Sequence, residues 1–553
     1  MSAWPGHERG APRKGALMAA ADQISISWTP ARSVAGTRNP WVIIAVISIA
    51  TFMVVLDSSI ANVALAHIAG GLSASYDEAT WIITSFLIAT AIIIPVSGWL
   101  ADVIGRKRYY MISVGLFTFA SILCGLAPNL TVLIIGRVLQ GLAGGGLAPV
   151  EQSMTVDTFP PHKRGMAFAV YGMVVIGGPI LGPTLGGWIT DNLSWHWVFL
   201  INFPVGLLSL VLVGLLVKEP AAVEKSRQLL LRHRLKIDVI GFILIALFLG
   251  CLEVTLDRGQ QDDWFSSPMI TAFAIVSASA LVIFIPWELS HKNPIVRIRL
   301  FGAGNFLISN VFMLIMGIII FGSTQFIPQL LQQVMGYTAT NAGLALSLGG
   351  LAMLLAMPLS GYLTAKVDPR YLITFALVIQ GIALWNMSTL DTQIGFRDAS
   401  MIRLVQSIGL PFLFVPITNV AYLGVRAGDN NQASAIMNIS RNLGGTIGIS
   451  FVQTMLARRS QFHQAQYAET LNPLNPNYAF GLRHITNALA NPRIHHSQAS
   501  RAALTALYRS LETQASMLSY IDVFHVLMWV VLGSIPLVLF LRKPSKFGIG
   551  EFH

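Results

Sequence analysis

Long apolar segments constrain this chain more than any other feature of its sequence. A helix needs about twenty apolar residues to cross the hydrocarbon core of a bilayer. Charged residues make up only 11% of the chain, whereas soluble domains contain about a quarter. We therefore predict an all-α polytopic membrane protein. Its roughly fourteen apolar runs lie near 41–68, 80–101, 109–127, 131–157, 167–190, 195–217, 238–257, 268–288, 304–333, 340–364, 371–390, 399–424, 434–457 and 522–541.

The positions of the lysines predict the orientation of these helices. All ten lysines lie in the N-terminal tail, in alternate loops or in the C-terminal tail, as in "GRKRYY", "PPHKRG" and "LRKPSK". Positive residues concentrate on the cytoplasmic side of membrane proteins. We therefore expect both termini, including the tail 1–40, to be cytoplasmic, and the polar segment 457–521 to be external. The net charge of +11 fits this pattern and does not indicate nucleic-acid binding.

Self-comparison of the sequence indicates an internal repeat. "PVSGWLADVIGRKRYY" starts at Pro95 and "PLSGYLTAKVDPRYL" at Pro358, an offset of 358 − 95 = 263. "GRVLQG" around Arg137 and "IRLVQS" around Arg403 are offset by 403 − 137 = 266. Two copies of a six-helix unit in the same orientation are the plan of major facilitator transporters. The predicted parts are a first bundle at 41–217, a linker with two extra helices at 218–302, and a second bundle at 303–553.

The loop after the second predicted helix, "GWLADVIGRKR", resembles a loop of that superfamily. The family usually has an arginine directly after the aspartate, where this chain has Val103. The resemblance implies a gating role, and the alternative is a plain cytoplasmic topology signal. The predicted gating residues are Gly98, Asp102, Gly105, Arg106, Lys107 and Arg108.

The fifth predicted helix contains "GMVVIGGPILGPTLGGWI", which resembles the antiporter signature of the same superfamily. Small residues four apart let two helices approach closely, and proline kinks a helix. The doubled G-P pattern is far more specific than a single GxxxG. We expect a role in helix packing and sealing for Gly178, Pro179, Gly182, Pro183, Gly186 and Gly187.

An acidic residue, Asp57, lies inside the first apolar run, where a charge costs roughly 2.5–3.5 kcal/mol on insertion scales. Its surroundings, "LDSSIANVAL", resemble the first-helix motif of the drug:proton antiporters of the EmrB/QacA type, with Asp57 and Asn62 at matching positions. The resemblance implies that Asp57 takes part in proton or cation coupling. The alternative is an Asp57 satisfied permanently by an arginine or asparagine within the bundle.

Other charged residues in the apolar runs are further candidates for proton coupling or transport. Arg137 matches a fourth-helix arginine that the family associates with proton transfer, and the alternative is an arginine that snorkels to the nearby surface. Glu253 is either functional or an interfacial charge. The remaining candidates are Glu151, Arg403 and Arg441.

The polar segment 457–521 shows helical spacing of apolar residues at Leu504, Leu507, Tyr508, Leu511, Ala515 and Leu518. We expect a helical excursion outside the membrane. It resembles the region of EmrB-type pumps that work with a periplasmic adaptor and an outer-membrane channel. The alternative is a lid over this protein alone.

Together these features predict a proton-driven exporter of amphipathic toxic compounds in a bacterial inner membrane, working by alternating access. The expected partners are lipid, amphipathic small molecules, protons, an adaptor (membrane fusion protein) and an outer-membrane channel. We expect no cofactor, no metal and no enzymatic activity, because no catalytic or phosphate-binding motif is recognisable. The alternatives are a stand-alone exporter of one metabolite or fatty acid, and a non-transporting receptor or scaffold on the same fold.

Overall fold

The computed structural model describes residues 39–218, 238–291, 293–324, 326–392, 394–423, 425–472, 475–489 and 496–542. The predicted tail 1–40 lies almost entirely outside the described residues. Every regular element within them is helical, and each of the fourteen predicted apolar runs falls on helix. The prediction of an all-α membrane protein is therefore confirmed.

Eight helices lie in the first described range, 39–218. The fourth predicted run is divided at Gly145 and Gly146 into α5 and α6. A Cβ at Gly145 would lie 2.6 Å from Ile93 Cγ2, so the glycines let α3 approach closely where the helix breaks. The helices are α2 (Pro40–Gly71), α3 (Tyr76–Ile104), α4 (Arg106–Gly125), α5 (Leu130–Gly144), α6 (Leu147–Thr158), α7 (Pro161–Asn192), α8 (Trp197–Leu200) and α9 (Asn202–Leu216).

Two helices of the predicted linker follow, and then the second part of the chain. The helices α11 (Val239–Arg258) and α12 (Pro268–Ser290) pack against each other, and α11 also contacts α3. Short 3-10 turns, η1 (Trp264–Ser266), η2 (Ile298–Gly302) and η4 (Ala427–Asp429), occur in the connections. The later elements are α13 (Gly304–Thr324), α14 (Phe326–Gln329), η3 (Leu330–Val334), α15 (Ala339–Thr364), α16 (Pro369–Ser388), α17 (Phe396–Ala421), α18 (Asn430–Thr470), α19 (Pro476–Leu489), α20 (His496–Gly533) and η5 (Ile535–Phe540).

Twelve spans in the described residues are long and apolar enough to cross a membrane. The helices α7 and α18, which hold the predicted runs 167–190 and 434–457, are not among them. The mean hydropathy of α18 is lowered by polar side chains such as Gln432 and Asn438. These side chains are buried against other helices, so they are not exposed to lipid. The count of fourteen spanning helices stays a prediction.

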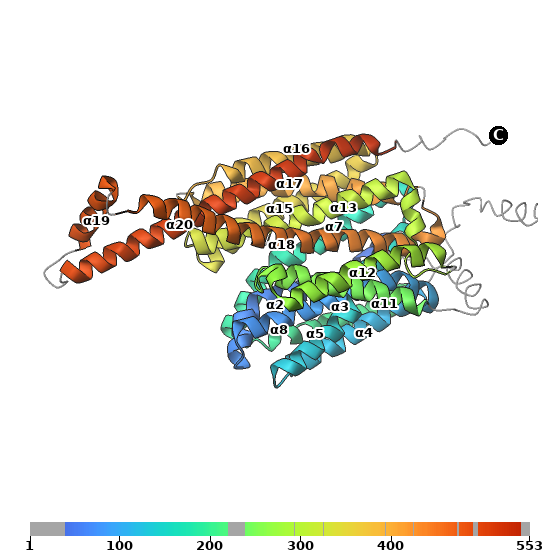
Figure 1. The fold of residues 1–553 in the computed structure, drawn as a ribbon. Coiled ribbons are helices and arrows are strands. Elements are labelled where there is room, and N and C mark those ends of the chain that lie inside the picture. The colour runs from blue at the N-terminus through green and yellow to red at the C-terminus, as the bar shows by residue number, and fades with distance from the viewer. Residues whose placement is uncertain are drawn as a thin grey trace, which may run out of the picture. The chain divides into compact units, whose positions relative to one another are not determined.

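The two repeats are joined by contacts between particular helices. Figure 1 shows α2, α3, α4, α5 and α8 in one group and α13 and α15 to α18 in another. Contacts between α7 and α15 and between α3 and α18 connect the groups. The division at 217 and 302 stays a prediction, because nothing in the packing marks those boundaries.

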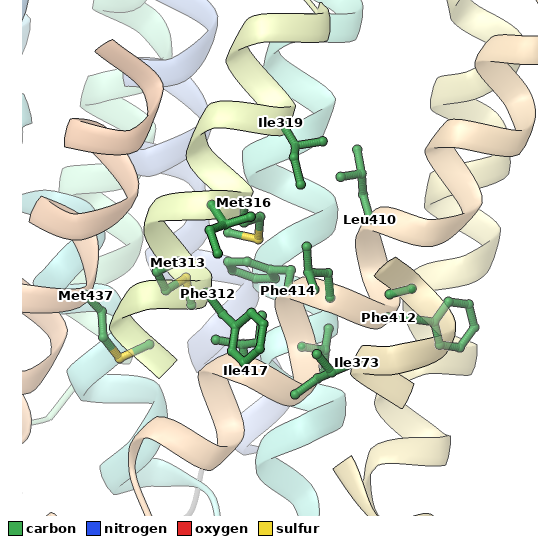
Figure 2. Close-up of a cluster of buried hydrophobic side chains, with 14 of the residues drawn as sticks. Phe312, Met313, Met316, Ile319, Ile373, Leu410, Phe412, Phe414, Ile417 and Met437 are labelled. Carbon is green, nitrogen blue, oxygen red and sulfur yellow. The ribbon is translucent and has the colours of Figure 1, made fainter. Parts of the chain in front are cut away.

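The second group has a continuous apolar core between α13, α16, α17 and α18. Its phenylalanine and methionine side chains interdigitate in Figure 2, and the core positions are less than a tenth exposed. Dense packing of this kind holds the helices in register. The labelled residues are Phe312, Met313, Met316, Ile319, Ile373, Leu410, Phe412, Phe414, Ile417 and Met437.

Candidate functional site

Asp57 and Arg137 form a fully buried ion pair between α2 and α5. Arg137 Nη1 donates to Asp57 Oδ2 at 2.6 Å. The two side chains are 0% and 1% exposed. The interpretation of Arg137 as a snorkelling surface residue is therefore wrong, because its guanidinium does not reach the surface.

Neutral polar side chains complete this site, which we call the Asp57 cluster: Asp57, Arg137, Gln140, Asn202 and Ser121. Asn202 Nδ2 donates to Asp57 Oδ1 at 2.6 Å, and Gln140 Nε2 donates to the same oxygen at 3.2 Å. Both amides also donate to Ser121 Oγ, at 2.9 and 2.6 Å. All five residues are at most 1% exposed, so the carboxylate is stabilised by a cation and two amides in place of water.

Arg137 has further partners besides Asp57. Its Nε donates to the Ile82 carbonyl at 3.0 Å, and Nη1 donates to Gln140 Oε1 at 3.0 Å. The guanidinium lies 4.1 Å from the centre of the Phe86 ring and 5.8 Å from that of Phe199. These contacts are typical of a desolvated arginine. In this conformation Asp57 has both an arginine and an asparagine as partners within the bundle. Whether it takes part in coupling or is satisfied permanently stays a prediction.

Asn62, which the motif makes a candidate for proton coupling or transport, does not belong to the Asp57 cluster. It is exposed on α2. Five residues separate it from Asp57, which rotates it by about 140° around a helix of 3.6 residues per turn. Asn202, at the start of α9, takes the place next to the carboxylate. Asn202 could have been found in the sequence, because it is the only amide side chain in the apolar run 195–217.

The repeat reproduces half of this site. Arg403 Nη1 donates to Gln406 Oε1 within α17, as Arg137 does to Gln140 within α5. The position of α13 that corresponds to Asp57 is 57 + 263 = 320, which is Ile320. The acidic member of the cluster is therefore specific to the first half.

Glu151 on α6 is a second buried acid with different surroundings. It is 0% exposed. Its two carboxyl oxygens accept hydrogen bonds from Ser48 and Thr51, both on α2. Among the residues that the structure describes, no Lys, Arg or His forms an ion pair with it.

A chain of polar side chains beside Glu151 crosses to the second half. Gln152 Nε2 donates to the Tyr171 hydroxyl at 3.2 Å, and Asn438 Nδ2 donates to Gln152 Oε1 at 2.9 Å. Arg441 Nη2 in turn donates to Asn438 Oδ1 at 2.9 Å. The chain links α6 and α7 to α18, and it ends at the predicted residue Arg441.

The predicted gating loop contacts the first residues of α18. Asp102 accepts a hydrogen bond from Asn431, and Arg106 pairs with Asp157 at the end of α6. Asn430 Nδ2 also donates to Asp157, at 2.7 Å. These contacts join the halves at the end where α3, α6 and α18 meet.

The other gating positions have distinct local roles. Gly105 has φ 97°, a left-handed conformation that favours glycine, and it separates α3 from α4. A Cβ at Gly98 would lie 2.9 Å from the Asn431 carbonyl oxygen, so α18 packs directly on this glycine. Lys107 Nζ donates to the Gly214 carbonyl at 2.9 Å, and Arg108 is exposed.

Glycines of the antiporter signature form a flat face of α7 against α2. A Cβ at Gly178 would lie 2.7 Å from Val55 Cγ1, and one at Gly186 would lie 3.1 Å from Ile60 Cγ2. A Cβ at Gly182 would overlap Ser59. Gly187 has open space beside it and Pro179 is exposed, so neither belongs to this face; the Pro183 side chain is not described.

Glu253 is 6% exposed, and its assignment as a functional or an interfacial charge stays a prediction. Its carboxyl oxygens accept from the Thr446 hydroxyl at 3.0 and 3.3 Å. This contact joins the inserted helix α11 to α18. One helical turn further along α11, Asp257 accepts a hydrogen bond from Thr84 of α3.

The predicted external segment is helical in its described part, as expected. The helix α18 continues to Thr470, and α19 packs against the first part of α20. The buried face of α20 here contains Ala499 and Ala503, whereas Leu504 and Tyr508 are 52% and 59% exposed. The predicted apolar stripe is thus only partly covered. A polar cavity of about 460 Å³ lies nearby, between η3, α18 and α20.

Comparison with known proteins agrees with this architecture. The model of the Major Facilitator Superfamily matches residues 47–449. The multidrug export protein EmrB of Haemophilus influenzae is 42% identical over 431 residues, covering 78% of this chain and 83% of that protein. The fatty acid resistance protein FarB of Neisseria gonorrhoeae is 33% identical over 519 residues, covering 93% and 98%.

A solved structure shares the fold. The proton:xylose symporter XylE, bound to 6-bromo-6-deoxy-D-glucose, superposes with a TM-score of 0.58 at 14% identity, covering 91% of this chain and 96% of that one. These relationships place the chain among transporters and not among enzymes. The chain belongs to the major facilitator superfamily, in its EmrB-type drug:proton antiporter family.

Proposed function

We propose that this protein exports structurally varied amphipathic toxic compounds from the cell, driven by protons that move inward. The observation that carries this proposal is a set of ionisable side chains buried inside the helical bundle, namely the Asp57 cluster and Glu151. The Asp57 cluster holds a carboxylate, an arginine and two amides away from water, and Glu151 holds a second carboxyl group on α6. Intramembrane ionisable residues of this kind mark ion pathways and proton relays.

Alternating access between the two halves supplies the transport step. The contacts of Asn430 and Asn431 with Asp157 and Asp102 lie at the end that carries the lysine-rich loops. With both termini in the cytoplasm of a bacterial inner membrane, these contacts close the cytoplasmic side. The conformation described here is then the outward-facing one, and the opposite conformation requires that they break.

The substrate class is supported by relatives and by the arginines. EmrB of Haemophilus influenzae is named as a multidrug export protein. FarB is named for fatty acid resistance, which favours fatty acids as a second candidate class. Arg441 is half-buried in the contact between the halves and offers a cation for a carboxylate headgroup, whereas Arg137 is already neutralised by Asp57.

The external segment supports an adaptor as partner. Leu504 and Tyr508 of α20 and Phe480 of α19 are exposed, Phe480 to 75%. Apolar side chains on a small helical excursion favour burial against another surface. We propose that this surface belongs to a periplasmic adaptor that leads to an outer-membrane channel.

Transport in proteoliposomes tests the proposal. Purified protein is reconstituted, and accumulation of ethidium or of a long-chain fatty acid is followed with and without an imposed pH gradient. One pH unit corresponds to about 1.36 kcal/mol, which is about a ten-fold accumulation per proton. We expect gradient-dependent accumulation that an ionophore abolishes. Equal uptake with and without the gradient would contradict proton coupling, and no movement of any compound would favour a receptor or scaffold.

A further inference from the structure

Two buried acids lie at α2, Asp57 on the helix itself and Glu151 of α6 against it, but their surroundings differ in charge. Asp57 has a cation at 2.6 Å. Glu151 has only the hydroxyl groups of Ser48 and Thr51. Because of this difference, Glu151 is the acid suited to exchange a proton, and Asp57 is the acid suited to stay charged.

The ion pair makes Asp57 a poor proton carrier. Protonation of Asp57 would leave Arg137 as an uncompensated charge with 0% exposure. Breaking a buried pair by neutralising one partner is strongly unfavourable. Asp57 is therefore suited to hold Arg137 and the helices α2, α5 and α9 in place while both stay charged.

Glu151 meets the opposite condition. A charged carboxylate with no counter-ion is costly in a buried site, whereas a neutral carboxyl group with two hydroxyl partners is well accommodated. The titratable groups that face it are Tyr110 of α4 and Tyr171 of α7. A cation, Arg441 of α18, lies beyond these groups: it interacts with Tyr171 and donates to Asn438, the partner of Gln152.

The position of Glu151 connects its charge to the conformation. Its neighbour in sequence, Gln152, bonds to Asn438 of the second half at 2.9 Å. Separation of the halves at this contact would expose Glu151 to water. Water would then stabilise the carboxylate, whereas the conformation described here offers it only two hydroxyl groups.

We propose that Glu151 is the carboxyl group that carries the proton during export, and that Asp57 is a positioning residue that stays paired with Arg137. This inference rests on the proposed proton-driven function. Glu151 binds a proton in the conformation described here. When the cytoplasmic side opens, its O–H bond breaks, the proton passes to cytoplasmic water and the carboxylate remains. No other reactant is needed.

The experiment separates the driving force from the transport pathway. Proteoliposomes holding the full-length protein are assayed for ethidium accumulation driven by a pH gradient, and for exchange of labelled against unlabelled ethidium without any gradient. We expect Glu151→Gln to lose the gradient effect, from about ten-fold to about one-fold for one pH unit, and to keep exchange near the wild-type rate. Asp57→Asn should lose both, because Arg137 is left unpaired.

Matched variants control for structural effects. Glu288→Gln neutralises a glutamate that is 2% exposed on the inserted helix α12, and it should change neither assay. Glu151→Asp should restore gradient-driven accumulation in part. Ser48→Ala with Thr51→Ala should shift its pH optimum, because both hydrogen-bond donors to the carboxyl group are lost.

Each outcome decides between the explanations. Wild-type gradient dependence in Glu151→Gln would overturn the inference, and so would loss of exchange in both Glu151→Gln and Glu151→Asp, which would indicate a structural role. If the wild-type protein itself exchanges ethidium but ignores the gradient, the proposed proton coupling fails first.

Discussion

Replacement of Asp57 by asparagine tests the central ion pair most directly. The change removes the charge that lies 2.6 Å from Arg137 Nη1 and leaves the guanidinium buried. Loss of one partner of a buried pair costs about 3–5 kcal/mol. We expect about 3 kcal/mol, at the lower end, because Arg137 keeps the Ile82 carbonyl and the Phe86 ring.

The free energy of unfolding can be measured by titration of the purified protein with a denaturing detergent. Asp257→Asn is the matched control, because the asparagine carbonyl can still accept from the Thr84 hydroxyl, so the expected cost is at most about 1 kcal/mol. The double variant Asp57→Asn with Arg137→Gln should recover part of the stability. If it is no more stable than Asp57→Asn alone, the unpaired charge is not the cause.

The same variant has a transport readout. Asp57→Asn should insert into the membrane in normal amounts and lose proton-coupled export, whereas Asp57→Glu, which keeps a negative charge beside Arg137, should keep partial activity. Wild-type efflux with wild-type pH dependence in Asp57→Asn would refute a role for this carboxylate in transport.

Three further predictions concern the arginine, the glycine face and the external segment. Arg137→Ala should reduce vesicle transport at normal protein levels and Arg137→Lys should rescue it in part, because lysine keeps the charge but loses the planar donors; full activity of the alanine variant would contradict this. Gly182→Ala should destabilise the protein by about 1–3 kcal/mol in detergent titration, because a Cβ there overlaps Ser59, whereas Gly187→Ala, with open space, should not. Equal stability of the two would contradict the packing argument. Replacement of 460–518 by a short linker should preserve vesicle transport and lower drug resistance of whole cells, and polar substitutions at Leu504, Leu507 and Leu511 should weaken adaptor co-purification. Full cellular resistance would refute docking, and loss of vesicle transport would indicate a lid.

Local sequence patterns identified residues that are unfavourable or unusual in a membrane helix. Asp57 and Arg137 stand out because charges are rare in apolar runs, and the glycine pattern of α7 stands out because its spacing matches one helix face. Asn62 was misplaced and Asn202 was missed for one reason. A motif records neighbours in the chain, whereas partners of a carboxylate come from whichever helices surround it.

The sequence by itself determined that the chain is helical, membrane-embedded and built from a repeat. Each of these properties follows from segment length, composition or self-similarity, which are local or one-dimensional. Only the tertiary structure decided which acid is paired. Asp57 and Arg137 are separated by 80 residues, and Glu151 and Ser48 by 103. Whether a buried carboxylate meets a guanidinium or a hydroxyl group depends on how α2 packs against α5 and α6, and the electrostatic energy of each acid depends on that packing because the interior offers no water to replace a missing partner.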